Sequence, residues 1–244
     1  TMGNNLGWSD AAMFNLVKAL ELALNDGVCT LTGKQMGAHT GTLKEFDSYE
    51  DVLTALNTQV DFFFERMIMC CEVVERAHAE LLPSPFLSCV IDDCMGTGVD
   101  VTAGGAHYNL SGIQAIQCAN VADSLAALKT LVYDERLVDR AELHEALISN
   151  FELAELLRLR LLNKAPKYGN DVEWVDAIAF DWAKAFAERL SRYTNVRGGP
   201  YQMGLYTVSA HVPMGQNVGA TPDGRFAKDP LADGGMSPVY GRDN

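Results

Sequence analysis

The final part of the chain, residues 198–244, constrains the fold most, because it is rich in glycine and proline and still carries many apolar side chains. Its apolar residues are Met203, Leu205, Tyr206, Val208, Val212, Met214, Phe226, Leu231, Met236, Val239 and Tyr240. A solvated tail would lack such anchors. A compact domain rarely contains so long an irregular segment unless it serves a site or an interface. We therefore predict a strand at residues 204–212, followed by a packed irregular path.

Composition and charge limit the class of protein. With 244 residues, 48% of them hydrophobic, the chain is large enough to bury a sizeable core. A net charge of −13 argues against a surface that binds nucleic acid or anionic membrane. No window approaches the ~18 uninterrupted apolar residues of a transmembrane helix, and residues 1–10 do not have the pattern of a signal peptide. We expect neither a nucleic-acid nor a membrane partner.

The six cysteines indicate reduced thiols in the cytoplasm rather than a disulfide scaffold, because no Cys-x-x-Cys pair occurs and the apolar core is large. A metal site built from Cys89, Cys94 and His107 fits no standard zinc spacing. Asp92 and Asp93 suit capping of the next segment better than a metal site. We expect no metal.

Hydrophobic periodicity predicts alternating helices and short strands. The predicted helices are residues 11–25, 48–80, 120–133, 140–148, 151–162 and 174–193. The further predicted strands are residues 86–91 and 113–118. Polar residues at strand ends and the rhythm of strand, turn and helix indicate an α/β fold, a helix-wrapped barrel with a site at its strand ends. No linker or repeat is visible, so we take residues 1–244 as one structural unit or a piece of one.

Two residues of possible chemical interest have simpler explanations from the pattern alone. Ser9 or Asp10 would cap the helix at residues 11–25, so capping explains Asp10 better than catalysis does. His211 alternates with apolar neighbours on the predicted strand, which is typical of a core residue.

Several strings, in order along the chain, resemble the pyruvate formate-lyase domain of the glycyl radical enzymes. They are GGAHYN (104–109), KYGND (167–171), RGG (197–199), GATPDGR (219–225) and PLADG (230–234), the last followed by Ser237-Pro238. The resemblance runs through essentially the whole chain. The string GWSD (7–10) is most similar to glycerol and propanediol dehydratases.

The resemblance implies a fold and a place within it. The family has a ten-stranded α/β barrel wrapped by long helices, and residues 1–244 resemble an internal part of it. No cysteine here is followed by Val-Glu, and no Arg-Val-x-Gly-Tyr string occurs. We therefore expect residues 1–244 to lack the upstream thiyl-cysteine loop and the C-terminal glycyl radical domain, and we assign no catalytic residue within them.

The resemblance also implies site residues. Asp10 falls where the dehydratases hold a substrate hydroxyl, and Tyr206 falls where they place a tyrosine near the substrate. His107 stands where an acidic residue is expected, which bears on the substrate class. The family signature, expected to be structural, falls on Gly104, Gly105, Tyr108, Asn109, Asp223, Gly224, Arg225 and Asp233.

The implied function is radical dehydration (a lyase reaction) of a small diol such as glycerol or 1,2-propanediol. The alternatives are a formate C-acetyltransferase or another glycyl radical lyase or decarboxylase, and a segment that is inert alone. The implied enzyme binds no cofactor and carries a glycyl radical that a separate radical S-adenosylmethionine activase installs. It is expected to be a cytoplasmic homodimer with a small-molecule substrate, and a bacterial microcompartment is the alternative location.

Overall fold

The computed structural model describes residues 5–242, and their contacts divide the chain into two compact units. The first unit holds the residues up to Phe14, Phe64–Gln114 and Lys184–Gly204, and the second holds Asn15–Phe63, Ala115–Ala183 and the residues from Leu205 onward. Within the described part of the chain, no helix is both long enough and apolar enough to cross a membrane.

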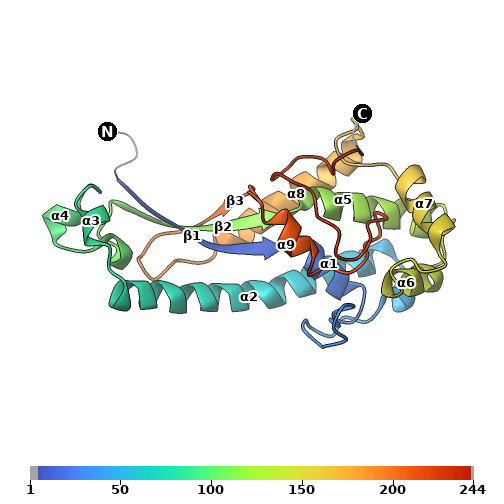
Figure 1. Ribbon diagram of the computed structural model, residues 1–244, viewed down its shortest axis with the longest axis horizontal. Helices are drawn as coiled ribbons and strands as arrows, with labels where there is room; N and C mark the ends of the chain where they lie inside the picture. The colour runs from blue at the N-terminus through green and yellow to red at the C-terminus, as the bar shows by residue number, and fades with distance from the viewer. Residues whose placement is uncertain (1–4, 243–244) are drawn as a thin grey trace. The chain divides into compact units, whose positions relative to one another are not determined.

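The elements follow one another in the order drawn in Figure 1. The strands are β1 (Leu6–Asn15), β2 (Tyr108–Ile116) and β3 (Tyr201–Gly204). The helices are α1 (Leu16–Ala23), α2 (Tyr49–Leu81), α3 (Pro85–Ser88), α4 (Cys94–Thr97), α5 (Cys118–Ala127), α6 (Arg140–Ile148), α7 (Glu155–Lys164), α8 (Glu173–Leu190) and α9 (His211–Gly215). Turns of 3-10 helix form η1 (Leu43–Glu45) and η2 (Val101–Ala103), and a π-helical turn, η3 (Leu128–Asp134), continues α5.

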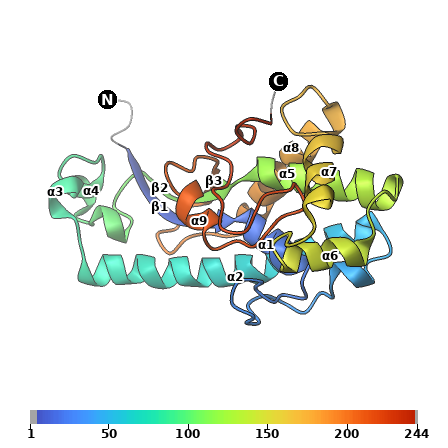
Figure 2. The same cartoon turned by 45° about the vertical axis from the view of Figure 1, so that its right-hand side comes forward.

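The first unit is built on a sheet with the strand order β1-β2-β3, in which β2 and β3 run parallel. Ser111 pairs with Tyr201 and Gln114 with Gly204. Because side chains alternate along each strand, this register gives the sheet two distinct faces. At the far end of α2, the short helices α3 and α4 lie side by side in both views (Figures 1 and 2).

Aromatic rings fill the other end of the first unit. The ring centroid of Phe14 lies 5.4 Å from that of Phe186, and Phe64 lies 5.1 Å from Phe186. Both pairs meet edge to face, which is a favoured geometry for aromatic contacts. The cluster joins the end of β1 to α2 and α8.

The second unit packs α1 against α5, which is buried along its whole length. On α1, the buried carboxylate of Glu21 receives the Lys18 ammonium at 2.8 Å, the Thr30 hydroxyl at 2.8 Å and the Gly219 N–H at 2.9 Å. A buried carboxylate needs such partners to offset its lost hydration. Glu21 therefore anchors the glycine-rich segment that begins at Gly219.

The long helices agree with the periodicity. The helix predicted at residues 48–80 is α2, and Ser48 and Asp51 cap it reciprocally, with N–H to oxygen distances of 2.9 and 3.2 Å. The helix predicted at residues 140–148 is α6. The remaining predicted helices and the strand at residues 113–118 are also confirmed, with ends shifted by a few residues.

The predicted start of the first helix is wrong. Residues 6–15 form β1, and the helix begins only at Leu16, where the Asn15 side chain accepts the Lys18 N–H at 3.1 Å. Neither Ser9 nor Asp10 is therefore an N-cap. The pairing of β1 with β2, about 100 residues away in sequence, overrides the local helical pattern.

Two predicted strands are also wrong. The strand expected at residues 204–212 ends at Gly204, and a turn in which Val208 has a φ of 51° leads into α9. His211 is therefore the first residue of a short helix. The apolar run at residues 86–91 begins as α3, where Pro85 occupies the first turn and suits a helix start.

Candidate functional site

Asp10 lies on β1 with its side chain exposed, and a neighbouring amide of the described chain holds it. The Nε2 of Gln114, on β2, donates to the Asp10 Oδ1 at 3.1 Å. Gln114 itself has no exposed surface. The register of β2 with β3 and the contacts of β1 with β2 place six residues on one surface of the sheet. We call this surface, formed by Trp8, Asp10, Gly112, Gln114, Gln202 and Gly204, the Asp10 face.

Two glycines shape the Asp10 face. A Cβ at Gly204 would lie 2.0 Å from the Oε1 of Gln114, and a Cβ at Gly112 would lie 2.2 Å from the Nε1 of Trp8. Each side chain therefore lies across the bare backbone of the next strand. This close approach is possible only where the neighbouring residue lacks a side chain.

The opposite surface of the sheet holds a buried arginine that ties its strands together. Arg197 donates to the carbonyl oxygen of Gly7 at 3.0 Å and to that of Leu110 at 2.7 Å. Its guanidinium lies 3.7 Å from the carboxylate of Glu75, which is also buried and accepts the Ser111 hydroxyl. Burial lowers the pKa of Arg197, and Glu75 opposes that effect. These bonds fix β1 against β2 directly behind Asp10.

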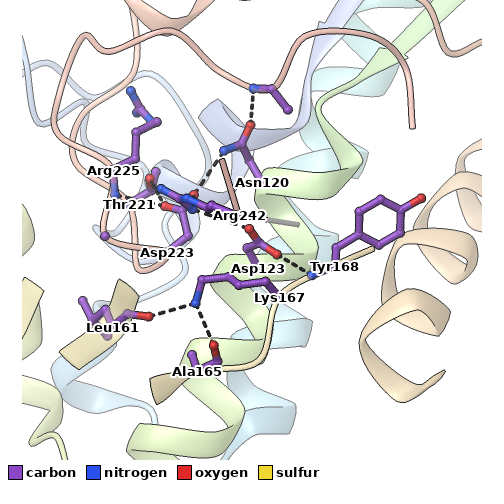
Figure 3. A network of polar contacts seen from close by, with 12 residues as sticks. Asn120, Asp123, Leu161, Ala165, Lys167, Tyr168, Thr221, Asp223, Arg225 and Arg242 are labelled. Carbon is purple, nitrogen blue, oxygen red and sulfur yellow. Dashed lines mark hydrogen bonds and ion pairs between the residues drawn. The ribbon is translucent and has the colours of Figure 1, made fainter. Parts of the chain in front are cut away.

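The second unit contains a separate buried polar network around Asp223 (Figure 3). The Asp223 carboxylate accepts from Asn120 at 3.1 Å and from Arg242 at 2.7 Å, and it also accepts the Thr221 hydroxyl. Arg242 lies 3.5 Å from a second buried carboxylate, Asp123. The network joins α5 to both ends of the segment at residues 219–242.

The pKa values of the two carboxylates in this network are shifted in opposite directions. Burial opposes ionisation of Asp223, but Arg242, Thr221 and Arg225 outweigh it and lower its pKa to about 2. Burial and the charge of Asp223 raise the pKa of Asp123 to about 6. A shared cation therefore stabilises one ionised carboxylate fully and the other only in part.

The signature residues in the first unit form a closed turn. Asn109 donates to the carbonyl oxygens of Gly104 and Ala106 at 3.1 and 3.0 Å. A Cβ at Gly105 would lie 2.0 Å from the Val99 oxygen, and Gly104 has a φ of 94°. Tyr108 is exposed, and the adjoining His107 pairs with Asp93 at 2.9 Å.

The signature residues in the second unit shape the backbone. The guanidinium of Arg225 donates to the carbonyl oxygens of Phe226 and Asp229, each at 2.8 Å. Gly224 has a φ of 86°, and a Cβ there would lie 2.7 Å from Leu162. Asp233 and Tyr206 are exposed. Tyr206 belongs to the second unit, whereas Asp10 belongs to the first.

Two buried cysteines of the chain, Cys71 and Cys118, are poorly suited to nucleophilic chemistry, which needs the thiolate. Cys118 is buried, and burial raises its pKa to about 12. Burial also raises the pKa of Cys71 to about 11. Among residues 5–242, no group of three or more histidines, cysteines, aspartates or glutamates could hold a metal ion.

Sequence patterns did not identify Gln114, which holds Asp10, or Glu75, which supports the opposite surface of the sheet, and they indicated Arg197 only as part of the RGG string. Gln114 interrupts the apolar run at residues 113–116, and Glu75 interrupts the apolar stripe of α2. A polar residue at a core position needs a buried hydrogen-bond partner, so its presence in an apolar pattern indicates a buried polar contact. Their partners are distant in sequence and appear only in the fold.

Comparison with known proteins decides the family. The family model described as pyruvate formate lyase-like matches residues 1–215. The chain belongs to this family of glycyl radical enzymes. Among curated relatives, it is 37% identical to a (2S)-3-sulfopropanediol dehydratase of Klebsiella oxytoca, over 98% of the chain and 29% of that protein.

Two solved structures resemble this family member closely. The glycerol-bound B12-independent glycerol dehydratase of Clostridium butyricum is 40% identical, with a TM-score of 0.85, over 91% of this chain and 28% of that one. The hydroxyproline dehydratase of Clostridioides difficile is 33% identical, with a TM-score of 0.93, over 99% of this chain and 30% of that one. The predicted α/β fold of the glycyl radical barrel is confirmed. The chain spans less than a third of these relatives, as expected for a segment.

Proposed function

We propose that this chain is a segment of a glycyl radical dehydratase, a lyase that acts on a small diol such as glycerol or 1,2-propanediol. The observation that carries the proposal is the exposed carboxylate of Asp10, held by Gln114 on the sheet. The name of the similar glycerol dehydratase supports it. A site that binds hydroxyl groups needs acceptors of this kind, because a carboxylate accepts strong, directional hydrogen bonds.

The charge of the Asp10 face favours a neutral substrate. Of the described side chains that define this face, only Asp10 is charged. Arg197 is committed to the opposite surface of the sheet, where it bonds to two strands. A sulfonate or carboxylate substrate would meet a negative charge here, whereas a diol would meet an acceptor. A lyase for a charged substrate would need cations from the rest of the enzyme.

The chain's own contribution to catalysis is orientation. By accepting a hydroxyl proton in a hydrogen bond, Asp10 would fix which C–H bond of the substrate faces the radical. The radical, installed on the intact enzyme by a radical S-adenosylmethionine activase, would supply the hydrogen-atom abstraction. Tyr206 is proposed as a further substrate contact. A cytoplasmic homodimer is proposed for the intact enzyme.

Product analysis tests the reaction class. The full-length enzyme containing this chain would be activated without oxygen and given glycerol, 1,2-propanediol or pyruvate. We expect an aldehyde from a diol. Cleavage of pyruvate without diol turnover would instead support a formate C-acetyltransferase. The isolated chain is expected to show neither turnover nor a glycyl radical signal in electron paramagnetic resonance after treatment with the activase.

Substitution of Asp10 tests its role. We expect Asp10→Ala to lower kcat/KM for the diol by about 100-fold or more, because orientation of the reacting carbon is lost. The melting temperature should change little, since the side chain is exposed. Asp93→Asn is the matched control, because Asp93 is an exposed aspartate of the same unit with one nitrogen partner, His107. Equal losses in the two variants would contradict the role of Asp10.

A further inference from the structure

Gln114 has a fully buried side-chain amide, and one of its two polar atoms makes no hydrogen bond in the described part of the chain. Its Nε2 donates to Asp10, but its Oε1 has no hydrogen-bond partner among residues 5–242. A buried acceptor without a donor is destabilising, because the hydrogen bonds it made to water are lost and not replaced. Such a group therefore needs a partner from water, from the rest of the enzyme or from a ligand.

The surroundings of the Gln114 Oε1 indicate that its missing hydrogen-bond donor comes from a ligand. The Oε1 is buried and lies against the backbone of Gly204, where a Cβ would come within 2.0 Å, so no side chain of β3 stands between it and the Asp10 face at that position. The same amide touches Asp10, which is exposed. Two acceptors, a carboxylate and an amide carbonyl, thus stand next to each other on neighbouring strands. Two adjacent hydroxyl groups are the matching pair of donors.

We propose that Gln114 is a specificity-determining residue of the Asp10 site. Its N–H holds the Asp10 carboxylate, and its Oε1 accepts a hydrogen bond from the second hydroxyl of the substrate. This inference rests on the proposed function, because it assigns the second hydroxyl of the diol to a particular atom. It predicts that the enzyme distinguishes a diol from the corresponding mono-alcohol through this amide.

Glutamine is suited to this role because it offers both a donor and an acceptor. An apolar residue would leave Asp10 unheld and the second hydroxyl without an acceptor. An ionised glutamate would place a second negative charge beside Asp10, and the two like charges would disfavour double ionisation. A protonated glutamate would reproduce the glutamine pattern, with its O–H donating to Asp10 and its carbonyl oxygen accepting from the substrate.

Equilibrium binding to the unactivated full-length enzyme tests the assignment without turnover. Dissociation constants for 1,2-propanediol and 1-propanol would be measured by nuclear magnetic resonance for the wild type and Gln114→Met. We expect the diol to bind about 10- to 100-fold more weakly to the variant, because a hydrogen bond to a buried polar group is lost. The affinity for the mono-alcohol should change much less. The variant should therefore lose most of its preference for the diol.

Gln114→Glu gives an independent readout that a purely structural role would not move. We expect its affinity for the diol to be weak at about pH 8 and to approach the wild-type value at about pH 5.5, as the carboxylate pair takes up a proton. Wild-type affinity should change little over this range. A Gln114→Glu variant that binds the diol equally at both pH values would contradict the proposal.

Gln59→Leu is the control for losing a buried amide. Gln59 is fully buried on α2 and bonds to Ala38 and Thr40, so its loss should lower stability but leave diol affinity unchanged. Wild-type enzyme that binds no diol would overturn the proposed function and this inference with it. Diol binding that is unaffected by Gln114→Met, or weakened equally with mono-alcohol binding, would overturn this inference alone.

Discussion

At the scale of single residues, Asp123 and Asp223 are two buried carboxylates that share one arginine. Asp223 has the closer contact to Arg242, at 2.7 Å against 3.5 Å for Asp123. Asp223 also accepts hydrogen bonds from Asn120 and Thr221. Asp123 lacks this degree of stabilisation, so the folded state resists its ionisation.

This difference predicts a pH dependence of stability. The pKa of Asp123 is raised to about 6 from 3.8, so between these values the folded state keeps a proton that the unfolded state releases. The contribution of Asp123 therefore becomes more favourable as pH falls from about 7 to about 4, by on the order of 3 kcal/mol. The lowered pKa of Asp223 acts oppositely, and its contribution is lost as pH falls from about 4 towards 2.

Denaturant unfolding of the wild type and Asp123→Asn at about pH 7 and about pH 5 measures this effect. Because the variant cannot titrate at this position, the wild type should gain stability relative to it at the lower pH. Parallel changes in the two proteins would show that Asp123 titrates normally in the folded state.

At the scale of elements, the sheet sets the geometry of the Asp10 face through its glycines. Gly204→Ala would push the flexible end of Gln114 away from β3, since the new Cβ would lie 2.0 Å from Oε1. We expect a small loss of stability but a clear loss of diol affinity, as Asp10 loses its partner. Gly96→Ala is the matched control, because a Cβ there meets nothing within 4 Å. Binding and melting measurements on both variants separate the two effects, and wild-type affinity in Gly204→Ala would contradict this view of the face.

The helices and strands also show which parts of the secondary structure could be predicted from the sequence. Helix α2 was predictable because its apolar stripe and its Ser48 cap are local signals. The strand β1 was not, because its conformation depends on pairing with β2, and the residues near Met13 also fit a helical face. The end of β3 at Gly204 was missed for a similar reason, since residues 205–212 alternate like a strand but turn at Val208.

The candidate site divides in the same way. Asp10 was found through resemblance, but its expected helix-capping position was wrong, because it lies on a strand. Gln114 was not found, because its meaning depends on a contact across 104 residues of sequence. Periodicity identifies which side chains share a face of one element, whereas a site joins faces of several elements.

At the scale of the whole chain, the first unit exposes strand edges and apolar side chains that no described part of the chain covers. Strands β1 and β3 each have one neighbour in the described sheet, so each leaves one edge of its backbone unpaired. The exposed apolar residues of this unit include Met69, Val73, Leu81, Leu82, Phe86, Leu87, Val90 and Met95. Open strand edges and exposed apolar side chains both favour association.

We therefore expect the chain, expressed alone, to self-associate, and to do so more strongly as salt rises. Its net charge of −13 opposes contact between copies at low ionic strength, and salt screens that repulsion. Light scattering at two protein concentrations and two salt concentrations measures the effect. Phe86→Glu combined with Val73→Glu should reduce association, because it places charges on the two exposed side chains. Asp61→Asn combined with Glu80→Gln, which removes charge from α2 without touching these apolar residues, should not reduce it. A monomer at all four conditions that melts sharply and reversibly would contradict the prediction, because it would show that these surfaces do not drive contact between copies.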